Sequence, residues 1–339
     1  MTKKVILLLA VVFGLSARLP LFAQGKENPF KRGAGSFEYT GYTTIKKPIT
    51  LFYYIPTKGN VKKMRVLFSM HGDERSGYFQ RNVWRNLAEE HGFIVLAPQF
   101  SRENKWMEND YQFGGVSASA KEFILKPKEE WTYAIIEHLF DYFKACTGNT
   151  AKVYDMFGHS AGGQFVHRYL LMTPNARVGK AVAANPGNYT YPDDTITLGW
   201  PYSLYGTPFA TDEYLVPFFK RKLTILIGTK DRELATARSP KLHVYAVQGI
   251  HRYDRAWKFF NASKLIAQKK GYEFNWSIGE VPDAGHGTPP MVFGNVNVRS
   301  KEIEKDENTP GNVDKRFLKT FNNEDVTNMG AYHIIFEEK

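Results

Sequence analysis

Short apolar runs alternate with longer segments of helical spacing through most of this sequence. The apolar runs lie at residues 65–70, 93–97, 152–157, 178–184, 223–227 and 273–278. Apolar residues recur at helical intervals at 79–91, 131–145, 163–172 and 253–270. This alternation predicts an α/β protein whose central sheet is mostly parallel and covered by helices on both faces. Two β-rich runs joined by a short polar link come first and predict an antiparallel pair, at 37–45 and 49–56.

The composition is that of a folded, globular chain. Of its 339 residues, 43% are apolar and 23% are charged, which is too apolar for intrinsic disorder. Cys146 is the only cysteine, which excludes an internal disulfide, a cysteine zinc site and an iron–sulfur cluster. The formal net charge is +11, but the lysines are scattered along the chain. We therefore expect a solvated surface that favours anionic polymers or envelopes, and no nucleic-acid partner.

The first residues have the pattern of an export signal. Lys3 and Lys4 precede an apolar stretch at 5–15, and residues 21–23 match a cleavage site. A membrane span needs roughly 20 apolar residues, which is more than this stretch provides. We expect residues 1–23 to be a signal peptide and the mature protein to be periplasmic or secreted, without a stable membrane span. A retained anchor is the alternative, because Arg18 interrupts the segment before the cleavage site.

A G-x-S-x-G motif follows the apolar run at 152–157 and opens the next helical segment. Its residues are Gly158, His159, Ser160, Ala161 and Gly162. A nucleophilic serine requires this strand–turn–helix context, because a sharp turn pushes its hydroxyl into the cleft. Side chains at the two glycine positions would clash with neighbouring backbone in such a turn. We predict that Ser160 is a nucleophile; the alternative is an ordinary glycine-rich turn.

A serine hydroxyl needs a base that removes its proton. His286 follows the last predicted strand in a glycine-flanked loop, where a base could reach across the end of the sheet. His159 adjoins Ser160, but at such a turn its side chain should project away from the serine. His251 is the chief rival of His286, although it precedes a helix whose pattern indicates packing.

An imidazole base needs an acid that fixes its tautomer and stabilises its charged form. Asp231 follows the apolar run at 223–227, so its carboxylate should lie just beyond a buried strand. We predict that Asp231 orients His286. Asp193 and Asp194 are possible substitutes, though neither follows a strand.

Acyl transfer also needs donors for the oxyanion that develops on the substrate. The backbone N–H of Ala161, at the start of the helix after the serine, is one candidate. The turn after the run at 65–70 should supply the second, which we assign to the N–H of Asp73 with Gly72 as the fallback. The alternative role of the Asp73 side chain is an ion pair with Arg75.

These motifs resemble the α/β-hydrolase family over roughly residues 49–290. The nearest types are secreted esterases similar to polyhydroxybutyrate depolymerases and feruloyl esterases. The resemblance rests on residues 71–72, 158–163, 228–231 and 283–287, and on the chain order of serine, aspartate and histidine. It implies an α/β-hydrolase fold for residues 24–297 and a serine hydrolase without a cofactor. The segment 248–252 also looks similar to the family, but no chemical role follows from it.

Two regions go beyond a minimal hydrolase domain. Residues 188–221 separate two core strands and are rich in aromatic side chains. We expect them to form a wall or short lid beside Ser160, with Tyr189 and Trp200 in contact with substrate; the alternative is a loop packed by its own side chains. Residues 298–339 form a charged C-terminal extension of unassigned function, in which 331–336 could add an edge strand.

The sequence therefore predicts an exported carboxylic-ester hydrolase that acts on a small-molecule or polymer-linked ester. A peptidase or amidase with the same three residues is the alternative within enzymes. A non-catalytic protein that binds envelope glycans on a hydrolase scaffold is the alternative from a different class. We expect no metal, because the chain lacks an H-E-x-x-H motif or a clustered set of histidine and aspartate ligands.

Overall fold

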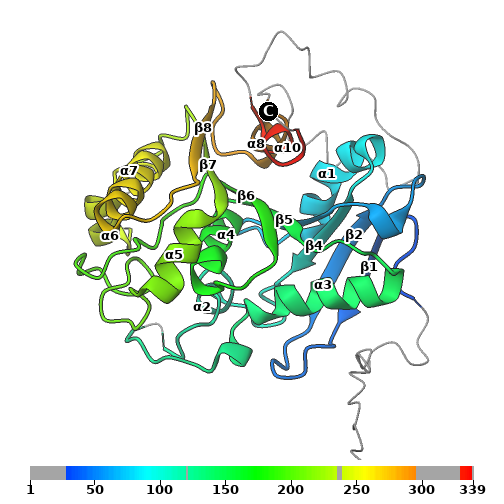
Figure 1. The fold of residues 1–339 in the computed structure, drawn as a ribbon, viewed down its shortest axis with the longest axis horizontal. Helices are drawn as coiled ribbons and strands as arrows, with labels where there is room; N and C mark the ends of the chain where they lie inside the picture. The colour runs from blue at the N-terminus through cyan, green and yellow to red at the C-terminus, as the bar shows by residue number, and fades with distance from the viewer. Residues whose placement is uncertain (1–27, 120, 235–238, 295–328, 338–339) are drawn as a thin grey trace, which may run out of the picture.

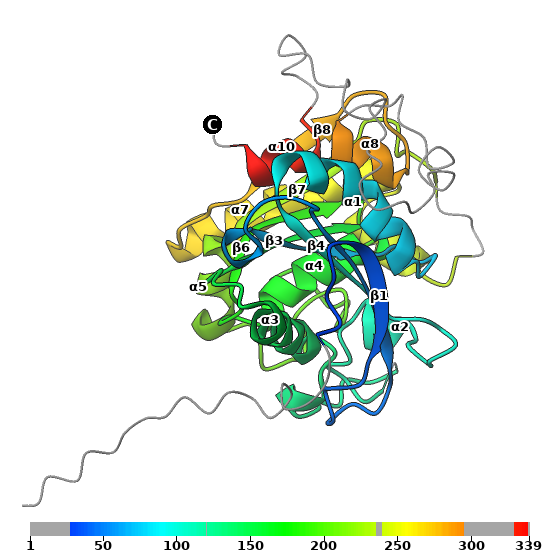
Figure 2. The same cartoon turned by 90° about the vertical axis from the view of Figure 1, so that its right-hand side faces the viewer.

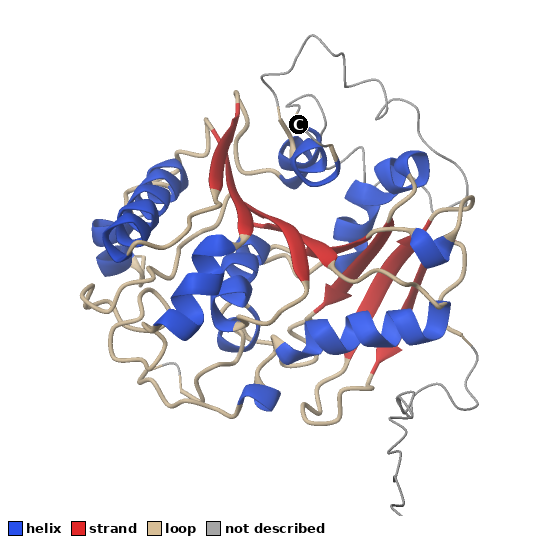
Figure 3. Ribbon diagram, in the orientation of Figure 1, coloured by secondary structure: helices blue, strands red, loops and turns tan. Residues whose placement is uncertain are grey.

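The computed structural model describes residues 28–119, 121–234, 239–294 and 329–337. An eight-stranded sheet runs through its centre, in the order β1-β2-β4-β3-β5-β6-β7-β8 (Figures 1 and 3). The strands are β1 (Gly33–Tyr39), β2 (Ile49–Ile55), β3 (Val66–Met70), β4 (Ile94–Gln99), β5 (Tyr154–His159), β6 (Val178–Ala184), β7 (Lys222–Gly228) and β8 (Ser277–Val281).

The sheet is mostly parallel, as predicted. The pairs β1–β2 and β2–β4 are antiparallel, and every neighbouring pair from β4 to β8 is parallel. The carboxyl ends of the parallel strands therefore meet at one edge of the sheet, which is where ligands bind in folds of this kind. The three residues predicted to carry the chemistry follow β5, β7 and β8 at that edge.

Helices cover both faces of the sheet (Figure 2). On one face α1, α8 and α10 pack on the strands, and on the other α3, α4, α5 and α7 do. The α-helices are α1 (Gly77–His91), α2 (Glu108–Tyr111), α3 (Ala134–Thr147), α4 (Ala161–Met172), α5 (Asp212–Lys220), α6 (Leu242–Gln248), α7 (Arg252–Lys270), α8 (Thr288–Phe293) and α10 (Ala331–Phe336). Short 3₁₀ turns form η2 (Val61–Lys63) and η3 (Lys128–Glu130).

Burial on both sides explains the continuous apolar strands. All five residues of β3 are buried, because both faces of the sheet are covered: Phe68 packs in the core on one face and Leu67 in the core on the other. The helices carry the usual end signals. In α1, the Ser76 hydroxyl accepts the N–H of Phe79, and Gly92 ends the helix in the left-handed conformation.

The structure corrects the expectation of an edge strand at 331–336, because this segment is the helix α10. Ala331 and Ile335 are four residues apart and fully buried, so one helical face packs into the core with α1 and α8. Gly330 permits the close approach that starts the helix: a β-carbon there would lie 2.2 Å from the backbone nitrogen of Gly294. Six residues are too few for periodicity to separate a helix from a strand.

The remaining expectations about the two ends of the chain concern residues that are mostly not described. The predicted signal peptide at 1–23 lies outside the described residues, as does most of the extension at 298–339. Within the described ranges, no helix combines the length and the apolar character that crossing a membrane requires.

Candidate active site

Ser160 lies on a strained turn between β5 and α4. β5 ends at His159 and α4 begins at Ala161, so the serine alone makes the turn from strand to helix. Its φ of 56° and ψ of −116° are values that residues other than glycine rarely adopt. The turn is anchored to the neighbouring strand, since the Ser160 N–H donates to the carbonyl of Ala184 at 2.9 Å. Strain that is held in place in this way is typical of functional positions.

Two glycines make this turn possible. A β-carbon on Gly158 would lie 2.2 Å from the carbonyl oxygen of Gly162. One on Gly162 would lie 2.1 Å from the carbonyl oxygen of Met70. The predicted clash of side chains with neighbouring backbone at these positions is confirmed.

The structure brings Ser160, His286 and Asp231 together in one hydrogen-bonded chain. His286 Nε2 lies 3.0 Å from Ser160 Oγ, and His286 Nδ1 lies 2.8 Å from Asp231 Oδ2. The Asp231 side chain is almost completely buried, whereas 28% of the His286 side chain is exposed. An acceptor-only carboxylate on Nδ1 fixes the tautomer, so Nε2 is left to accept the serine proton. The arrangement can therefore activate a hydroxyl.

Asn185 holds the two loops that carry the acid and the base, and sequence reasoning missed it. It directly follows β6 and is fully buried. Its side-chain oxygen accepts the N–H of Gly228 at 2.9 Å, and its side-chain nitrogen donates to the carbonyl of Gly285 at 3.2 Å. Its position after a buried strand was the same signal that singled out Asp231.

Two residues of the segment 248–252, which had no role in the sequence reading, support the site. Arg252 Nη1 lies 3.2 Å from Asp231 Oδ1, the carboxylate oxygen that does not face His286. Gln248 is fully buried and bonds the backbone of Tyr189 twice, accepting its N–H at 3.0 Å and donating to its carbonyl at 2.8 Å. The segment 248–252 thus contacts both Asp231 and Tyr189, which lies in the region that follows β6.

The alternative candidates for the base and the acid make local contacts instead. His251 Nδ1 accepts the N–H of Asp254 and caps the start of α7. Asp193 accepts the N–H and the hydroxyl of Thr195, both at 2.6 Å. Within the described ranges, no three His, Cys, Asp or Glu side chains cluster as metal ligands.

Ser160 opens into a polar cavity of about 350 Å³. Ala161 and Asp73, the predicted oxyanion donors, line it together with charged side chains, including Arg75, Arg102, Glu108, Lys241 and Arg252. The Asp73 carboxylate faces Arg102 at 2.7 Å and Arg75 at 3.7 Å, so the predicted pairing with Arg75 is present. The N–H of Gly72, the fallback donor, is engaged by Glu74 Oε1 at 3.0 Å.

A buried histidine fixes the turn that carries Asp73. His71 Nε2 accepts the N–H of Phe100 at 3.0 Å, and its Nδ1 therefore donates to the carbonyl of Gly72 at 2.8 Å. The Tyr111 ring stacks on this imidazole, with 4.2 Å between ring centroids. Burial lowers the pKa of His71 to about 3, so the ring stays neutral and keeps this pattern at ordinary pH.

His159 is buried beneath the catalytic candidates. Its Nδ1 lies 3.0 Å from the hydroxyl of Thr288, and its ring centroid lies 4.7 Å from that of His286. Burial, with smaller contributions from His286 and Arg252, holds its pKa well below the usual value. A neutral His159 therefore adds no competing positive charge beside His286.

The structure does not place Tyr189 and Trp200, the residues expected to contact substrate, at the cavity of Ser160. Tyr189 is fully buried and stacks on Phe259, with ring centroids 4.3 Å apart. Trp200 packs against Phe123 and Phe209, and neither aromatic residue lines the cavity of Ser160. Aromatic content alone does not distinguish a substrate wall from a packed segment, and here both side chains pack against rings of the fold, mostly outside residues 188–221.

A buried arginine ties this region to the helix that follows Ser160. Arg168 of α4 is fully buried and donates to Asn188 Oδ1 at 2.6 Å, to Thr190 Oγ1 at 2.7 Å and to the carbonyl of Pro201 at 3.2 Å. The residue directly before it, His167, belongs to the same network, because its Nε2 accepts the N–H of Thr190 at 3.1 Å. Residues 188–201 are thus fixed to α4 by polar contacts that apolar patterning does not reveal.

Arg168→Met should destabilise the protein strongly. It would leave several buried acceptors unsatisfied, each at a cost of about 1–3 kcal/mol, so we expect the free energy of unfolding to fall by about 3 kcal/mol or more. Denaturant unfolding measures the loss. Arg232→Met, at an exposed position, is the matched control and should change stability by about 0.5 kcal/mol or less. Equal effects in the two variants would contradict the assignment.

No protein-family model and no curated protein sequence matches this chain. Two solved structures are closely similar. Poly(aspartic acid) hydrolase-1 from Sphingomonas sp. KT-1 is 36% identical with a TM-score of 0.70, and the match covers 77% of this chain and 96% of that one. A poly(3-hydroxybutyrate) depolymerase from Bordetella parapertussis is 31% identical, also with a TM-score of 0.70, over 77% of this chain and 88% of that one.

Both similarities are close enough in sequence, and complete enough in length, to reflect common family membership rather than fold alone. The protein therefore belongs to the depolymerase and esterase group of the α/β-hydrolase family.

Proposed function

We propose that this protein is an exported serine hydrolase that cleaves carboxylic esters through an acyl-enzyme intermediate. Ser160 is the nucleophile, His286 the general base and acid, and Asp231 the residue that orients the imidazole. The observation that supports this most is the continuous hydrogen-bond chain from Ser160 Oγ through His286 to Asp231.

In the proposed reaction, Ser160 Oγ attacks the ester carbonyl carbon while His286 Nε2 takes the hydroxyl proton. The carbonyl π electrons move onto oxygen, and Asp231 stabilises the imidazolium that forms. When the tetrahedral intermediate collapses, the bond to the alcohol oxygen breaks and His286 returns the proton to that oxygen. Water, deprotonated by His286, then attacks the acyl carbon. When this second tetrahedral intermediate collapses, the bond from the acyl carbon to Ser160 Oγ breaks, His286 returns the proton to Oγ, and the acid is released.

The backbone N–H groups of Ala161 and Asp73 are the proposed donors to the tetrahedral oxyanion. Both residues line the cavity that Ser160 opens into. The N–H of Ala161 also lies in the first turn of α4, where the positive end of the helix dipole favours a negative charge. Residues 1–23 support export, because their basic start and short apolar stretch follow the pattern of a secretory signal.

Amide hydrolysis is the second candidate. The similar enzyme from Sphingomonas is named for poly(aspartic acid), a polymer joined by amide bonds, whereas the one from Bordetella is named for a polyester. Both reactions use the same three side chains. They differ in the leaving group, because an amine must be protonated before it departs and an alkoxide leaves more readily.

A matched pair of substrates separates these reactions. The two substrates are an ester and an amide that share the same acyl group and leaving-group skeleton. The ratio of their kcat/KM values, ester over amide, should exceed the ratio of their uncatalysed hydrolysis rates. The excess should be at least about tenfold, which is 1.4 kcal/mol of barrier. A ratio at or below that of the uncatalysed reactions would favour the amidase. A protein that bound envelope glycans without catalysis would turn over neither substrate.

A further inference from the structure

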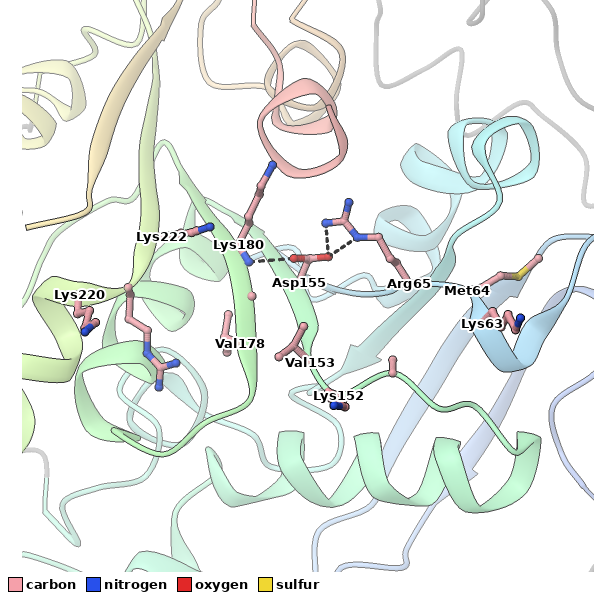
Figure 4. Close-up of a pocket in the computed structure, with 13 residues that line it drawn as sticks. Lys63, Met64, Arg65, Lys152, Val153, Asp155, Val178, Lys180, Lys220 and Lys222 are labelled. Atoms are coloured by element: carbon pink, nitrogen blue, oxygen red, sulfur yellow. Dashed lines mark hydrogen bonds and ion pairs between the residues drawn. The ribbon is translucent and has the colours of Figure 1, made fainter. Parts of the chain in front are cut away.

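Hollows at the two ends of the parallel strands differ in how their buried polar groups are paired. At the amino ends, a hollow of about 580 Å³ contains the buried carboxylate of Asp155, which accepts Arg65 at 2.7 Å and the backbone N–H of Lys180 at 2.9 Å (Figure 4). At the carboxyl ends lies the cavity of Ser160, of about 350 Å³. Its wall holds two buried side-chain amides that are only half engaged.

Arg168 fixes the direction of these two amides, which belong to Gln164 and Asn188. Its guanidinium donates to Asn188 Oδ1 at 2.6 Å and to Gln164 Oε1 at 3.4 Å. A guanidinium has no acceptor, so each amide turns its oxygen toward Arg168 and its nitrogen away. Both residues line the cavity, and each is more than nine-tenths buried. Within the described part of the chain, neither amide nitrogen has a hydrogen-bond partner, so two donors remain for a ligand.

Gly187 leaves room for the nitrogen of Gln164. It directly precedes Asn188 and also lines the cavity. A β-carbon on Gly187 would lie 2.9 Å from Gln164 Nε2, so any side chain there would displace the amide. The φ of Gly187 lies outside the left-handed region, and the backbone conformation therefore does not require glycine at this position. The missing side chain keeps a buried donor open to the cavity.

The charged side chains of the cavity are engaged with acidic or basic partners. The ion pairs are Arg102 and Arg75 with Asp73, Lys241 with Glu108, and Arg252 with Asp231. Among the described residues, no Val, Leu, Ile, Met, Phe or Trp lines the cavity. A purely alkyl acyl chain would therefore gain little from burial there, whereas an acceptor on the chain could engage the two free amide donors.

We propose that Gln164 Nε2 and Asn188 Nδ2, which we call the donor pair, bind a second carbonyl oxygen in the acyl group of the substrate. This inference rests on the proposed function and adds a substrate class to it: acyl groups that carry a further neutral carbonyl. Gln164 lies one helical turn beyond Ser160, because its N–H donates to the Ser160 carbonyl at 3.0 Å. One turn rises about 5.4 Å, a distance that a carbonyl a few carbons along the acyl chain spans.

The test compares two p-nitrophenyl esters whose acyl chains have equal length. The 4-oxopentanoate carries a ketone where the pentanoate has a methylene group. The readout is the ratio of their kcat/KM values, oxo ester over pentanoate, divided by the ratio of their uncatalysed hydrolysis rates. For the wild type we expect this normalised ratio to be about ten or more, which is the effect of two neutral hydrogen bonds.

Gln164→Glu and Asn188→Asp are the test variants. Each keeps an oxygen for Arg168 and replaces the free N–H donor with an oxygen that only accepts. We expect the normalised ratio to fall by about threefold or more in each variant. An effect of the new charge on His286 acts on both esters alike and cancels in the ratio. Gln268→Glu, exposed on α7, is the control with the same chemical change and should keep the wild-type ratio, while the thermal unfolding midpoint checks that all three variants fold.

A second readout needs no turnover. NMR titration of Ser160→Ala with methyl 4-oxopentanoate and with methyl pentanoate gives the two Kd values. We expect the oxo ester to bind more tightly, and the preference to fall when Gln164→Glu is added.

The two readouts separate the donor pair from the proposed function. Turnover of both p-nitrophenyl esters at a normalised ratio near one would overturn the role of the donor pair and leave the ester hydrolase in place. A preference that stays at the wild-type value in both folded test variants would also overturn it. Unchanged turnover in Ser160→Ala, together with tighter binding of the oxo ester, would instead overturn the role of Ser160 and support the donor pair.

Discussion

Replacing Ser160 with alanine is expected to lower kcat/KM for p-nitrophenyl acetate by about 10⁴-fold or more. The variant keeps the cavity, the imidazole and the backbone donors, but it has no oxygen that can form the acyl-enzyme. Triads of this kind lose activity on that scale when one member is removed, and the remaining groups give only a residual enhancement. Steady-state kinetics with the purified variant measure the loss.

The alanine variant should fold as the wild type does. Alanine keeps the β-carbon, so the strain at a φ of 56° is the same in both proteins, and the thermal unfolding midpoint should stay close to the wild-type value. Ser277→Ala on the edge strand β8 is a matched control that should retain full activity. Substantial turnover in a folded Ser160→Ala variant would remove the serine from the mechanism.

Asp231→Asn is expected to lower kcat by about 10⁴-fold. A buried amide can donate to Nδ1 of His286, which favours the tautomer with its proton on Nε2. That nitrogen then cannot take the proton of Ser160. Arg252 would also lose the charge that its guanidinium faces at 3.2 Å. Measurement of kcat at saturating ester tests this, with the circular dichroism spectrum as the check on folding.

Glu233→Gln is the matched control for this variant. Glu233 also faces Arg252, at 3.5 Å, but 80% of its side chain is exposed and it does not contact His286. We expect about wild-type kcat, because exposed ion pairs contribute little. A tenfold loss of activity corresponds to about 1.4 kcal/mol of activation free energy. If Asp231→Asn kept more than about a tenth of the wild-type activity, Asp231 would not be the orienting acid.

The sequence allowed the sheet and the three reactive residues to be predicted for the same reason. Parallel strands buried on both faces are nearly continuous apolar runs, and their carboxyl ends must meet at one edge of the sheet. A serine, an acid and a histidine that each follow such a run are therefore expected to converge. The structure places His286 within hydrogen-bond distance of both Ser160 and Asp231, as this reasoning requires.

Features that depend on long-range polar contacts could not be predicted in this way. Arg168 and Gln248 hold the segment after β6 in the interior, so Tyr189 stacks in the core instead of lining the cavity. Arg252 reaches Asp231 from the start of α7, across 21 positions of the chain. Apolar periodicity carries no information on such contacts.

Covalent labelling with a fluorophosphonate tests the central claim most directly, because the reagent reacts with a serine only where a base activates it. We predict one adduct per molecule in the intact mass, located at Ser160 by peptide mapping and absent after Ser160→Ala or His286→Ala. An adduct on another residue, or continued ester turnover by a protein that takes no label, would contradict the proposal that Ser160 forms the acyl-enzyme.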